Sequence, residues 1–200
     1  FSDIKGIHCH SLCEQNFDAL ENTWNKIWPF LKNVVKNLEW INLGGGHHIT
    51  RSDYKLNKLT NFLLELKAKT NCQIILEPGE AVVFESGILV GEILDYIQGD
   101  NNKIPNIGIT DISPVCHMPD VIEAPYRPML MNEPLKGKKV VLGGPSCLAG
   151  DIIGEYYFLK NPKIGDKVVF LDQAHYTLVK TNFFNGINHP EIVLWNSDNN

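Results

Sequence analysis

The sequence has no basic stretch and little excess charge of either sign. Asp and Glu outnumber Lys and Arg by 23 to 18, the formal net charge is −5, and both signs are spread along the chain. Nucleic-acid-binding proteins usually carry a basic patch or stripe, so this class is not indicated. No apolar run approaches the roughly 18 residues that a membrane-spanning helix requires. We therefore expect neither a nucleic-acid nor a membrane partner.

Cysteine is scarce, and its number is odd: Cys9, Cys13, Cys72, Cys116 and Cys147. A disulfide framework is typical of short secreted chains with an even number of cysteines, whereas this chain has 200 residues. A reducing compartment fits better, and we expect a cytoplasmic protein. The hydrophobic content of 44% and the charged content of 20% are ordinary for a globular chain.

The first 80 residues alternate between strand and helix patterns. Apolar residues recur at steps of three and four from Phe17 to Leu38, with Pro29 as the expected kink or break, and again from Leu56 to Leu66. Short apolar runs, "GIHC", "WINL" and "CQIIL", precede, separate and follow these two helical patterns. The order β-α-β-α-β with short connections predicts three parallel strands.

The pattern changes after about Ala81. Short β-rich runs are separated by turn signals: "GILVGEILDYIQ", "IPNIGITDIS", "KKVVLGG", "NPKIGDKVVFL" and "AHYTLV". We predict an α/β part over residues 1–82 and a mostly antiparallel β-domain over 83–200. Three parallel strands with both apolar helix faces on one side cannot close a barrel, and a complete (β/α)₈ barrel takes about 250 residues. The sequence therefore predicts the C-terminal portion of a longer polypeptide, with a small open α/β sheet as the alternative.

The three expected strand ends carry unusual residues. They are His8 and His10, the glycine triplet Gly44–Gly46, and Glu77 in "EPGE". Sites in parallel α/β folds gather at the carboxyl ends of the strands. A glycine turn lets backbone N–H groups approach an anion such as a phosphate. His-x-His also allows a metal site, because residues two apart on a strand share a face.

Seven motifs occur in a fixed order: "HCHSLCEQ", "GGGHHIT", "EPGE", "CHMPD", "EAPYRP", "SCLAGD" and "YTLVKTNFFNG". Together they resemble the pyridoxal-phosphate decarboxylases that combine an alanine-racemase-like barrel with a β-domain, a family that includes the ornithine and diaminopimelate decarboxylases. The versions present here are most similar to the branch that decarboxylates carboxynorspermidine or carboxyspermidine. The resemblance covers nearly all of the chain. It implies polyamine biosynthesis as the function, pyridoxal 5′-phosphate as the cofactor and a homodimer with shared active sites.

The resemblance also implies a role for each matching residue. His10 would stack on the cofactor ring, Glu77 would pair with the ring nitrogen, and the triplet Gly44, Gly45 and Gly46 would cradle the phosphate together with the Tyr176 hydroxyl. Cys147 would return a proton after carbon dioxide has left, acting in the site of the partner subunit. Glu123 and Asp151 would face amino groups of the carboxypolyamine.

The chain departs from the family pattern at three points. No lysine sits in a context comparable with the lysine that carries the cofactor, so this chain alone is expected to be inactive. Glu80 and Leu148 stand where ornithine decarboxylases carry an arginine and an acid. These two differences favour the carboxypolyamine branch over ornithine, and they leave diaminopimelate or another basic amino acid as the alternative substrate.

Two further interpretations of the sequence assign it to a different class of protein. A metal-dependent amidohydrolase also has a first strand that ends in His-x-His, but it needs His and Asp ligands on later strands, which the glycine triplet and "EPG" do not supply. A non-catalytic cofactor-binding module is distinguished by whether the complete polypeptide contains the lysine. We therefore expect no metal site, with His10 as a cofactor contact and His8 as its neighbour on the strand.

Overall fold

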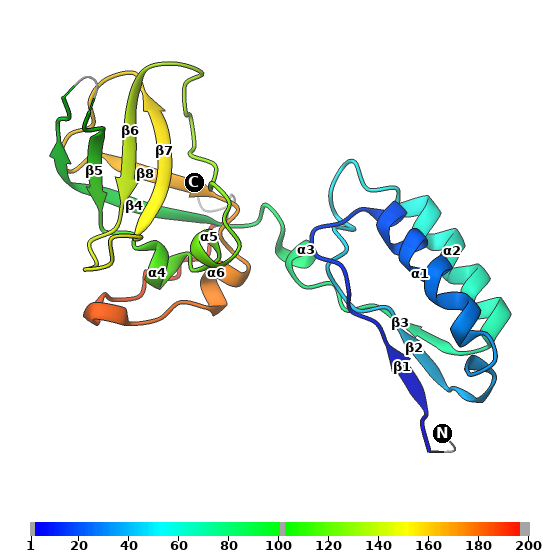
Figure 1. The fold of residues 1–200 in the computed structure, drawn as a ribbon. Helices are drawn as coiled ribbons and strands as arrows, with labels where there is room; N and C mark the ends of the chain where they lie inside the picture. Colours follow the sequence, from blue (N-terminus) through cyan, green and yellow to red (C-terminus); the bar gives the residue numbers. More distant parts are fainter. Residues whose placement is uncertain (1–2, 101–102, 197–200) are drawn as a thin grey trace. The chain divides into compact units, whose positions relative to one another are not determined.

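The computed structural model describes residues 3–100 and 103–196, and it divides into two compact units, Phe1–Phe84 and Glu85–Asn200 (Figure 1). Sequence analysis had placed the domain boundary between residues 82 and 83. Each unit has a sheet and a hydrophobic core of its own. Among the described residues, no helix is both long enough and apolar enough to cross a membrane.

The first unit is a three-stranded parallel sheet with two helices on one face (Figure 1). The strands are β1 (Gly6–His8), β2 (Trp40–Asn42) and β3 (Gln73–Ile75), in the order β1-β2-β3. Helices α1 (Phe17–Leu31) and α2 (Leu56–Thr70) make the crossovers, and the single turn α3 (Glu80–Val83) follows β3. The predicted β-α-β-α-β order and the parallel pairing are confirmed.

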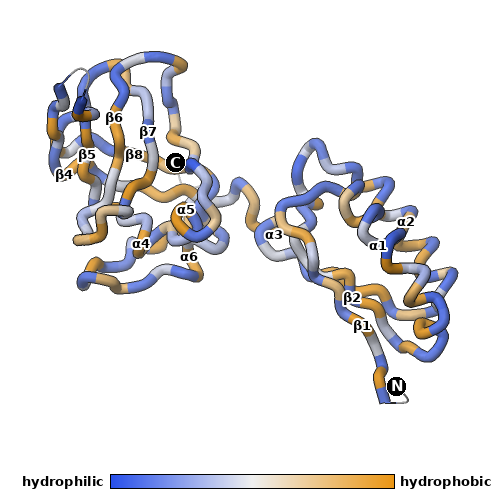
Figure 2. The backbone as a smooth tube through the Cα atoms, viewed as in Figure 1, coloured by the Kyte–Doolittle hydropathy of each residue, from blue (hydrophilic) through white to orange (hydrophobic). Residues whose placement is uncertain are grey.

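The helices form where the apolar period predicted them, and the period also fixes which face is buried. Phe17, Leu20 and Trp24 are the buried residues of α1, and Leu59 and Leu66 are those of α2. They pack with the central strand into one core. Figure 2 shows the hydrophobic positions as orange stretches along the chain of these strands and helices. Pro29 lies inside α1, which ends two residues later at Leu31. A separate 3₁₀ turn, Val35–Asn37, follows, and it buries Val35 while Val34, on the predicted apolar face, is exposed.

The second unit is a five-stranded sheet in the order β7-β6-β5-β4-β8. Its strands are β4 (Ile88–Ile97), β5 (Asn106–Thr110), β6 (Lys138–Gly143), β7 (Ile152–Phe158) and β8 (Lys167–Leu171). Three pairings are antiparallel, but β5 pairs with β6 in parallel. Parallel neighbours need a long crossover, and residues 111–137 supply it with the short helices α4 (Pro114–His117) and α5 (Asp120–Glu123).

Two details of the second unit differ from the sequence-based expectation. Strand β7 was not predicted, although it follows the "SCLAGD" motif directly. The run "AHYTLV" was predicted as a strand but forms helix α6 (Tyr176–Val179), and a 3₁₀ turn (Phe184–Gly186) lies further along. In α6 the backbone N–H groups of Val179 and Lys180 donate to the carbonyls of His175 and Tyr176. These local backbone hydrogen bonds form a helical turn that strand propensity alone does not predict.

Candidate functional site

The carboxyl ends of the three parallel strands are level with one another. In the register of the sheet His8 lies opposite Asn42, and Asn42 lies opposite Ile75. The loops that follow are therefore brought side by side. Glu77 N–H donates to the carbonyl of Gly44 at 2.8 Å, and Gln15 N–H donates to that of Gly46 at 3.1 Å. The three strand-end motifs found in the sequence form one cluster.

The glycine triplet is a tight turn that only glycine fits. Gly44 and Gly46 have φ values of +72° and +79°, in the left-handed region that other residues rarely adopt. A Cβ on Gly45 would lie 2.2 Å from the carbonyl oxygen of Glu77, and one on Gly46 would lie 1.8 Å from that of Leu12. The turn is thus packed against both neighbouring loops, and its Gly44 N–H donates to Asn42 Oδ1 at 2.8 Å. Glycine N–H groups in a turn of this kind can approach an anion closely.

Glu77 is held by polar groups from the other two strands. Asn42 Nδ2 donates to Glu77 Oε1 at 2.9 Å, and His8 Nε2 lies 3.1 Å from Glu77 Oε2. The hydrogen bond from Asn42, together with the charges and the hydrogen bond that His8 and His10 contribute, lowers the pKa of Glu77. The carboxylate is therefore ionised at neutral pH. It is suited to accept a hydrogen bond from a protonated ring nitrogen.

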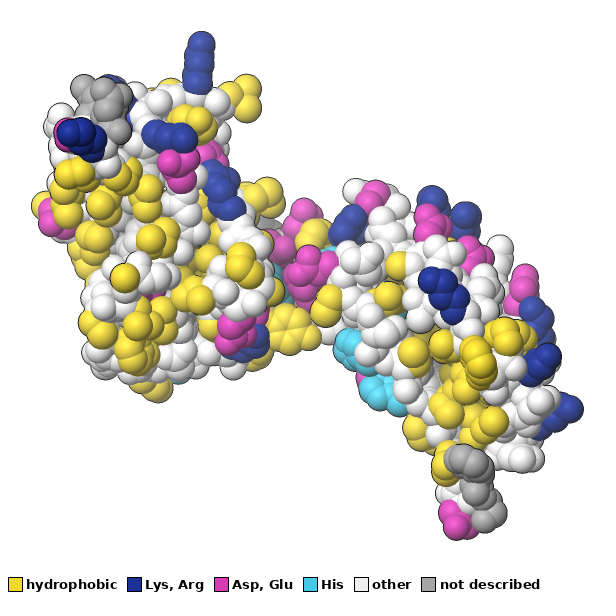
Figure 3. Space-filling view, in the orientation of Figure 1, with side chains coloured by type: hydrophobic (Ala, Val, Ile, Leu, Met, Phe, Trp, Pro, Cys, Tyr) yellow, Lys and Arg dark blue, Asp and Glu magenta, His cyan; other side chains and the backbone are white. Residues whose placement is uncertain are grey.

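The histidines near this edge divide into exposed and buried pairs. His8 and His10 are exposed, with ring centroids 6.2 Å apart in an edge-on arrangement, and Figure 3 shows histidine side chains at the surface of this unit. His47 and His48 are buried. Burial lowers the pKa of His47, whose Nε2 lies 3.4 Å from the carbonyl oxygen of Leu43. Only the exposed pair presents imidazoles to a ligand.

In the second unit Cys147 lies on the exposed loop between β6 and β7. Its backbone N–H donates to Asn185 Oδ1 at 3.0 Å. The motifs "SCLAGD" and "YTLVKTNFFNG" are therefore in contact. Gly150, in the same loop, has no atom within 4 Å of the place where a Cβ would lie. The thiol is therefore presented on an open, solvent-facing turn.

Asp151 closes the same loop, but its carboxylate points into the unit. The residue is only 3% exposed. Its Oδ1 accepts from Ser113 Oγ at 2.8 Å and from Val115 N–H at 3.1 Å, while Oδ2 accepts from Ser146 N–H at 3.1 Å. A substrate amine would have to displace one of these donors, and the contact with an amine stays a prediction.

Glu123 and Tyr176 lie near one another, and a lysine joins them. Lys180 Nζ is 2.6 Å from Glu123 Oε2 and 2.5 Å from Asp120 Oδ1, and it lies 5.9 Å from the centroid of the Tyr176 ring. These two carboxylates raise the pKa of Lys180. The predicted amine-binding carboxylate is thus already paired with an ammonium group of the chain.

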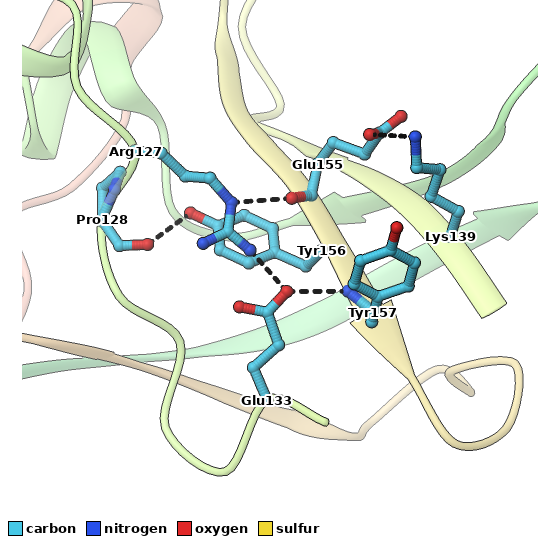
Figure 4. Close-up of polar contacts among 7 residues, drawn as sticks. All are labelled: Arg127, Pro128, Glu133, Lys139, Glu155, Tyr156 and Tyr157. Atoms are coloured by element: carbon cyan, nitrogen blue, oxygen red, sulfur yellow. Dashed lines mark hydrogen bonds and ion pairs between the residues drawn. The ribbon is translucent and has the colours of Figure 1, made fainter. Parts of the chain in front are cut away.

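The arginine of "EAPYRP", Arg127, makes hydrogen bonds within the second unit (Figure 4). Arg127 donates to the carbonyl of Glu155 at 2.8 Å and to the carboxylate of Glu133, and its guanidinium lies 4.0 Å from the ring centroid of Tyr156. The Tyr156 hydroxyl donates to the carbonyl of Pro128 at 2.8 Å. These contacts tie the segment after α5 to strand β7, so Arg127 has a structural role.

Comparison with known proteins assigns the chain to a family. Residues 17–174 match the family described as "Pyridoxal-dependent decarboxylase, C-terminal sheet domain". This match covers most of the chain and spans both units. The chain belongs to the pyridoxal-dependent decarboxylase family, whose cofactor is pyridoxal phosphate.

Several relatives match almost the whole chain. The chain is 40% identical to a carboxynorspermidine/carboxyspermidine decarboxylase of Campylobacter jejuni over 98% of this chain and 54% of the relative. It is 38% identical to a carboxyaminopropylagmatine decarboxylase of Synechocystis over 96% of this chain and 50% of the relative. A crystal structure of carboxynorspermidine decarboxylase from C. jejuni, complexed with norspermidine, superposes with a TM-score of 0.83 at 41% identity, covering 92% of this chain and 53% of that one.

The chain spans about half the length of the curated relatives it matches. The donor set of the first unit nevertheless fits pyridoxal phosphate. It offers a glycine turn for an anion, an ionised carboxylate for a ring N–H, and an exposed imidazole beside them. His10, the triplet Gly44–Gly46 and Glu77 would hold the cofactor.

Sequence analysis did not predict the partners that hold the candidate residues of either unit, and it named His8 only as a possible metal ligand and as the strand neighbour of His10. Asn42 and His8 hold Glu77, Lys180 pairs with Glu123, and Ser113 holds Asp151. A polar residue at the end of a buried strand was a usable signal for Asn42. For Lys180 and Ser113, no local pattern indicates a partner that lies 57 or 38 residues away.

Proposed function

We propose that the complete protein is a pyridoxal-phosphate-dependent carboxy-lyase that converts carboxynorspermidine or carboxyspermidine to the corresponding polyamine. One observation carries the proposal: the carboxyl edge of the first sheet joins a glycine turn to an ionised carboxylate held by two neighbours. When bound, the cofactor supplies an electron sink for the charge left by loss of carbon dioxide. The similarity to the C. jejuni relative supports this substrate class.

Each residue then has a stated task. Glu77 accepts a hydrogen bond from the ring nitrogen and keeps that nitrogen protonated, while His10 packs on the ring face. The turn Gly44–Gly46 and the Tyr176 hydroxyl bind the phosphate. Glu123 binds an amino group of the substrate. Asp151 faces a second amino group, which replaces one of the protein donors that now hold the Asp151 carboxylate.

Cys147 is proposed as the proton donor, acting in the site of a partner subunit of a homodimer. A thiol is a much stronger acid than a serine hydroxyl, so it returns a proton to carbon more readily. The exposure of the Cys147 loop supports this role, because a group that acts across an interface must be presented at the surface. The free thiols fit a cytoplasmic enzyme, and that location stays a prediction.

The test is reconstitution of the complete protein with pyridoxal phosphate. We expect stoichiometric cofactor, carbon dioxide release from carboxynorspermidine or carboxyspermidine, and a much lower kcat/KM for ornithine and diaminopimelate. A complete protein that binds no cofactor, or that prefers ornithine, contradicts the proposal. The lysine that carries the cofactor is expected in the part of the enzyme that precedes this chain, so the present 200 residues alone are expected to be inactive.

Carboxyaminopropylagmatine is the second candidate substrate, because the Synechocystis relative is 38% identical to this chain. That name indicates a guanidinium end group where the polyamine has an ammonium. A guanidinium binds carboxylates through two parallel hydrogen bonds, whereas an ammonium acts as a point charge. Ratios of kcat/KM for the two substrates decide between them.

The shared site of the proposed dimer has its own test. Cys147→Ala should still fold, since the side chain is exposed. It should either slow carbon dioxide release or yield an aldehyde by-product, because the thiol no longer delivers a proton to the substrate carbon that lost carbon dioxide. Mixing it with a variant that lacks the cofactor-carrying lysine should restore some activity, because one site of each mixed dimer keeps both groups. No rescue despite confirmed subunit exchange returns Cys147 to a structural role.

A further inference from the structure

Glu77 has one protein partner on each carboxylate oxygen. Asn42 Nδ2 donates to Oε1 at 2.9 Å, and His8 Nε2 lies 3.1 Å from Oε2. The terminal torsion of a glutamate is broad when the group is free. Two partners on different oxygens therefore fix the plane of this carboxylate. Each oxygen keeps a further lone-pair site for another donor.

The Asn42 side chain is itself fixed by the backbone. Its Oδ1 accepts from Gly44 N–H at 2.8 Å, and the residue is only 8% exposed. Because the oxygen is committed to the glycine turn, the amide nitrogen has to face Glu77. Asn42 thus connects the turn to the carboxylate and fixes one end of it.

His8 fixes the other end from the last position of β1, opposite Asn42 in the register of the sheet. A carboxylate only accepts hydrogen bonds. The 3.1 Å contact therefore requires a hydrogen on His8 Nε2. The His8 and Glu77 side chains are 47% and 49% exposed, so the pair lies at the open surface of the strand-end cluster.

We propose that His8 is a positioning residue for Glu77: its Nε2–H holds Oε2 so that the carboxylate stays aimed at the ring nitrogen of the cofactor. The inference rests on the proposed function and goes beyond it. Without His8, Glu77 keeps its hydrogen bond to Asn42 but can rotate about it. The contact with the ring nitrogen is then weakened, while the glycine turn and its anion-binding surface are unchanged.

The test measures binding of two probes to the cofactor-free complete protein. The first is 4-deoxypyridoxine 5′-phosphate, which has the ring nitrogen and the phosphate but no aldehyde to react with a lysine. The second is its 1-deaza counterpart, in which a C–H group replaces the ring nitrogen. We expect His8→Ala to weaken the first probe about tenfold, the equivalent of one charge-assisted hydrogen bond, and to leave the second within about twofold.

Two variants control the measurement. His8→Gln retains an amide N–H donor, so it should recover most of the affinity for the first probe. Lys5→Ala removes the 2.8 Å partner of another exposed carboxylate, Glu39, just before the start of the same strand. It should change neither dissociation constant.

Four results would overturn the inference. His8→Ala could bind the first probe as tightly as the parent protein, or it could lose affinity for both probes equally, which is the signature of general damage to the site. In both cases the parent protein still prefers the probe with a ring nitrogen, so the proposed function survives. A parent protein that binds neither probe, or shows no preference for the ring nitrogen, refutes the proposed function together with the inference.

Discussion

Replacing Gly46 by alanine tests whether the strand-end cluster is held by the close packing of the glycine turn. A left-handed conformation costs a residue with a Cβ about 1–2 kcal/mol, and Gly46 has a φ of +79°. The new Cβ would also lie 1.8 Å from the Leu12 carbonyl oxygen, whereas real contacts of this kind stay above 3.0 Å. The loop that carries His10 therefore has to retreat, and forcing atoms into a packed region costs about 1–3 kcal/mol.

We therefore expect Gly46→Ala to destabilise the first unit by about 2–5 kcal/mol. Gly44→Ala is the matched control, because its φ of +72° carries the same conformational cost but its nearest contact is 2.7 Å. It should cost less by about 1 kcal/mol. Gly186→Ala, with a φ of +73° and no atom within 4 Å, lies in the second unit and should leave the first unchanged.

The assay is urea unfolding of the complete protein. Unfolding is monitored by hydrogen exchange, read from the proteolytic peptide that contains β2. This readout is local to the first unit, so stability changes elsewhere do not contribute. Equal losses for Gly46→Ala and Gly44→Ala would refute the reasoning, since the two substitutions differ in the closeness of the neighbouring backbone. A negligible loss for both would show that the turn rearranges freely.

Three further predictions concern the second unit. Asp151→Ala leaves three buried or part-buried donors without their acceptor, so it should destabilise this unit by about 2–4 kcal/mol. It should also change the rate at which Cys147 is alkylated, which mass spectrometry measures. Asp151→Asn, which keeps one acceptor oxygen, should cost less, and equal costs would argue against the observed hydrogen bonds. Lys180→Met removes the internal ammonium from Glu123, so it should lower KM for the carboxypolyamine, whereas a higher KM would show that Lys180 serves only as a structural clamp. Burial lowers the pKa of His117, so the unfolded chain binds a proton first and stability should fall as pH drops below about 6.5. His117→Asn should flatten that pH dependence in urea midpoints, and an unchanged profile would contradict it.

The arrangement of the first unit was accessible from the sequence because its contacts follow local periodicity. An apolar period of three to four residues defines the buried faces of α1 and α2, and short crossovers make the strands parallel. Level strand ends then bring His10, the glycine turn and Glu77 together without any knowledge of side-chain packing. The order of the seven motifs led to the family that the comparison confirms.

The second unit was less accessible, because its pairings are distant in the sequence. The parallel pairing of β5 with β6 depends on a crossover of irregular chain, which leaves no periodic signal. The run "AHYTLV" has strand-forming residues, but no strand in the described part of the chain pairs with it, and local backbone hydrogen bonds make it the helix α6. Propensity describes a segment alone, whereas pairing depends on what the rest of the chain places beside it.

The sequence by itself determined the residue types that carry the chemistry, since a glycine turn, a carboxylate and a thiol have their properties wherever they lie. Only the tertiary structure decided which partners those groups have. It gave Glu77 two partners and Glu123 a lysine, and it turned the Asp151 carboxylate inward onto backbone and serine donors. The physical reason is that hydrogen bonds and ion pairs act over a few ångströms. Their partners are therefore set by distance in space, which the chain reaches only when its strands, helices and loops have packed.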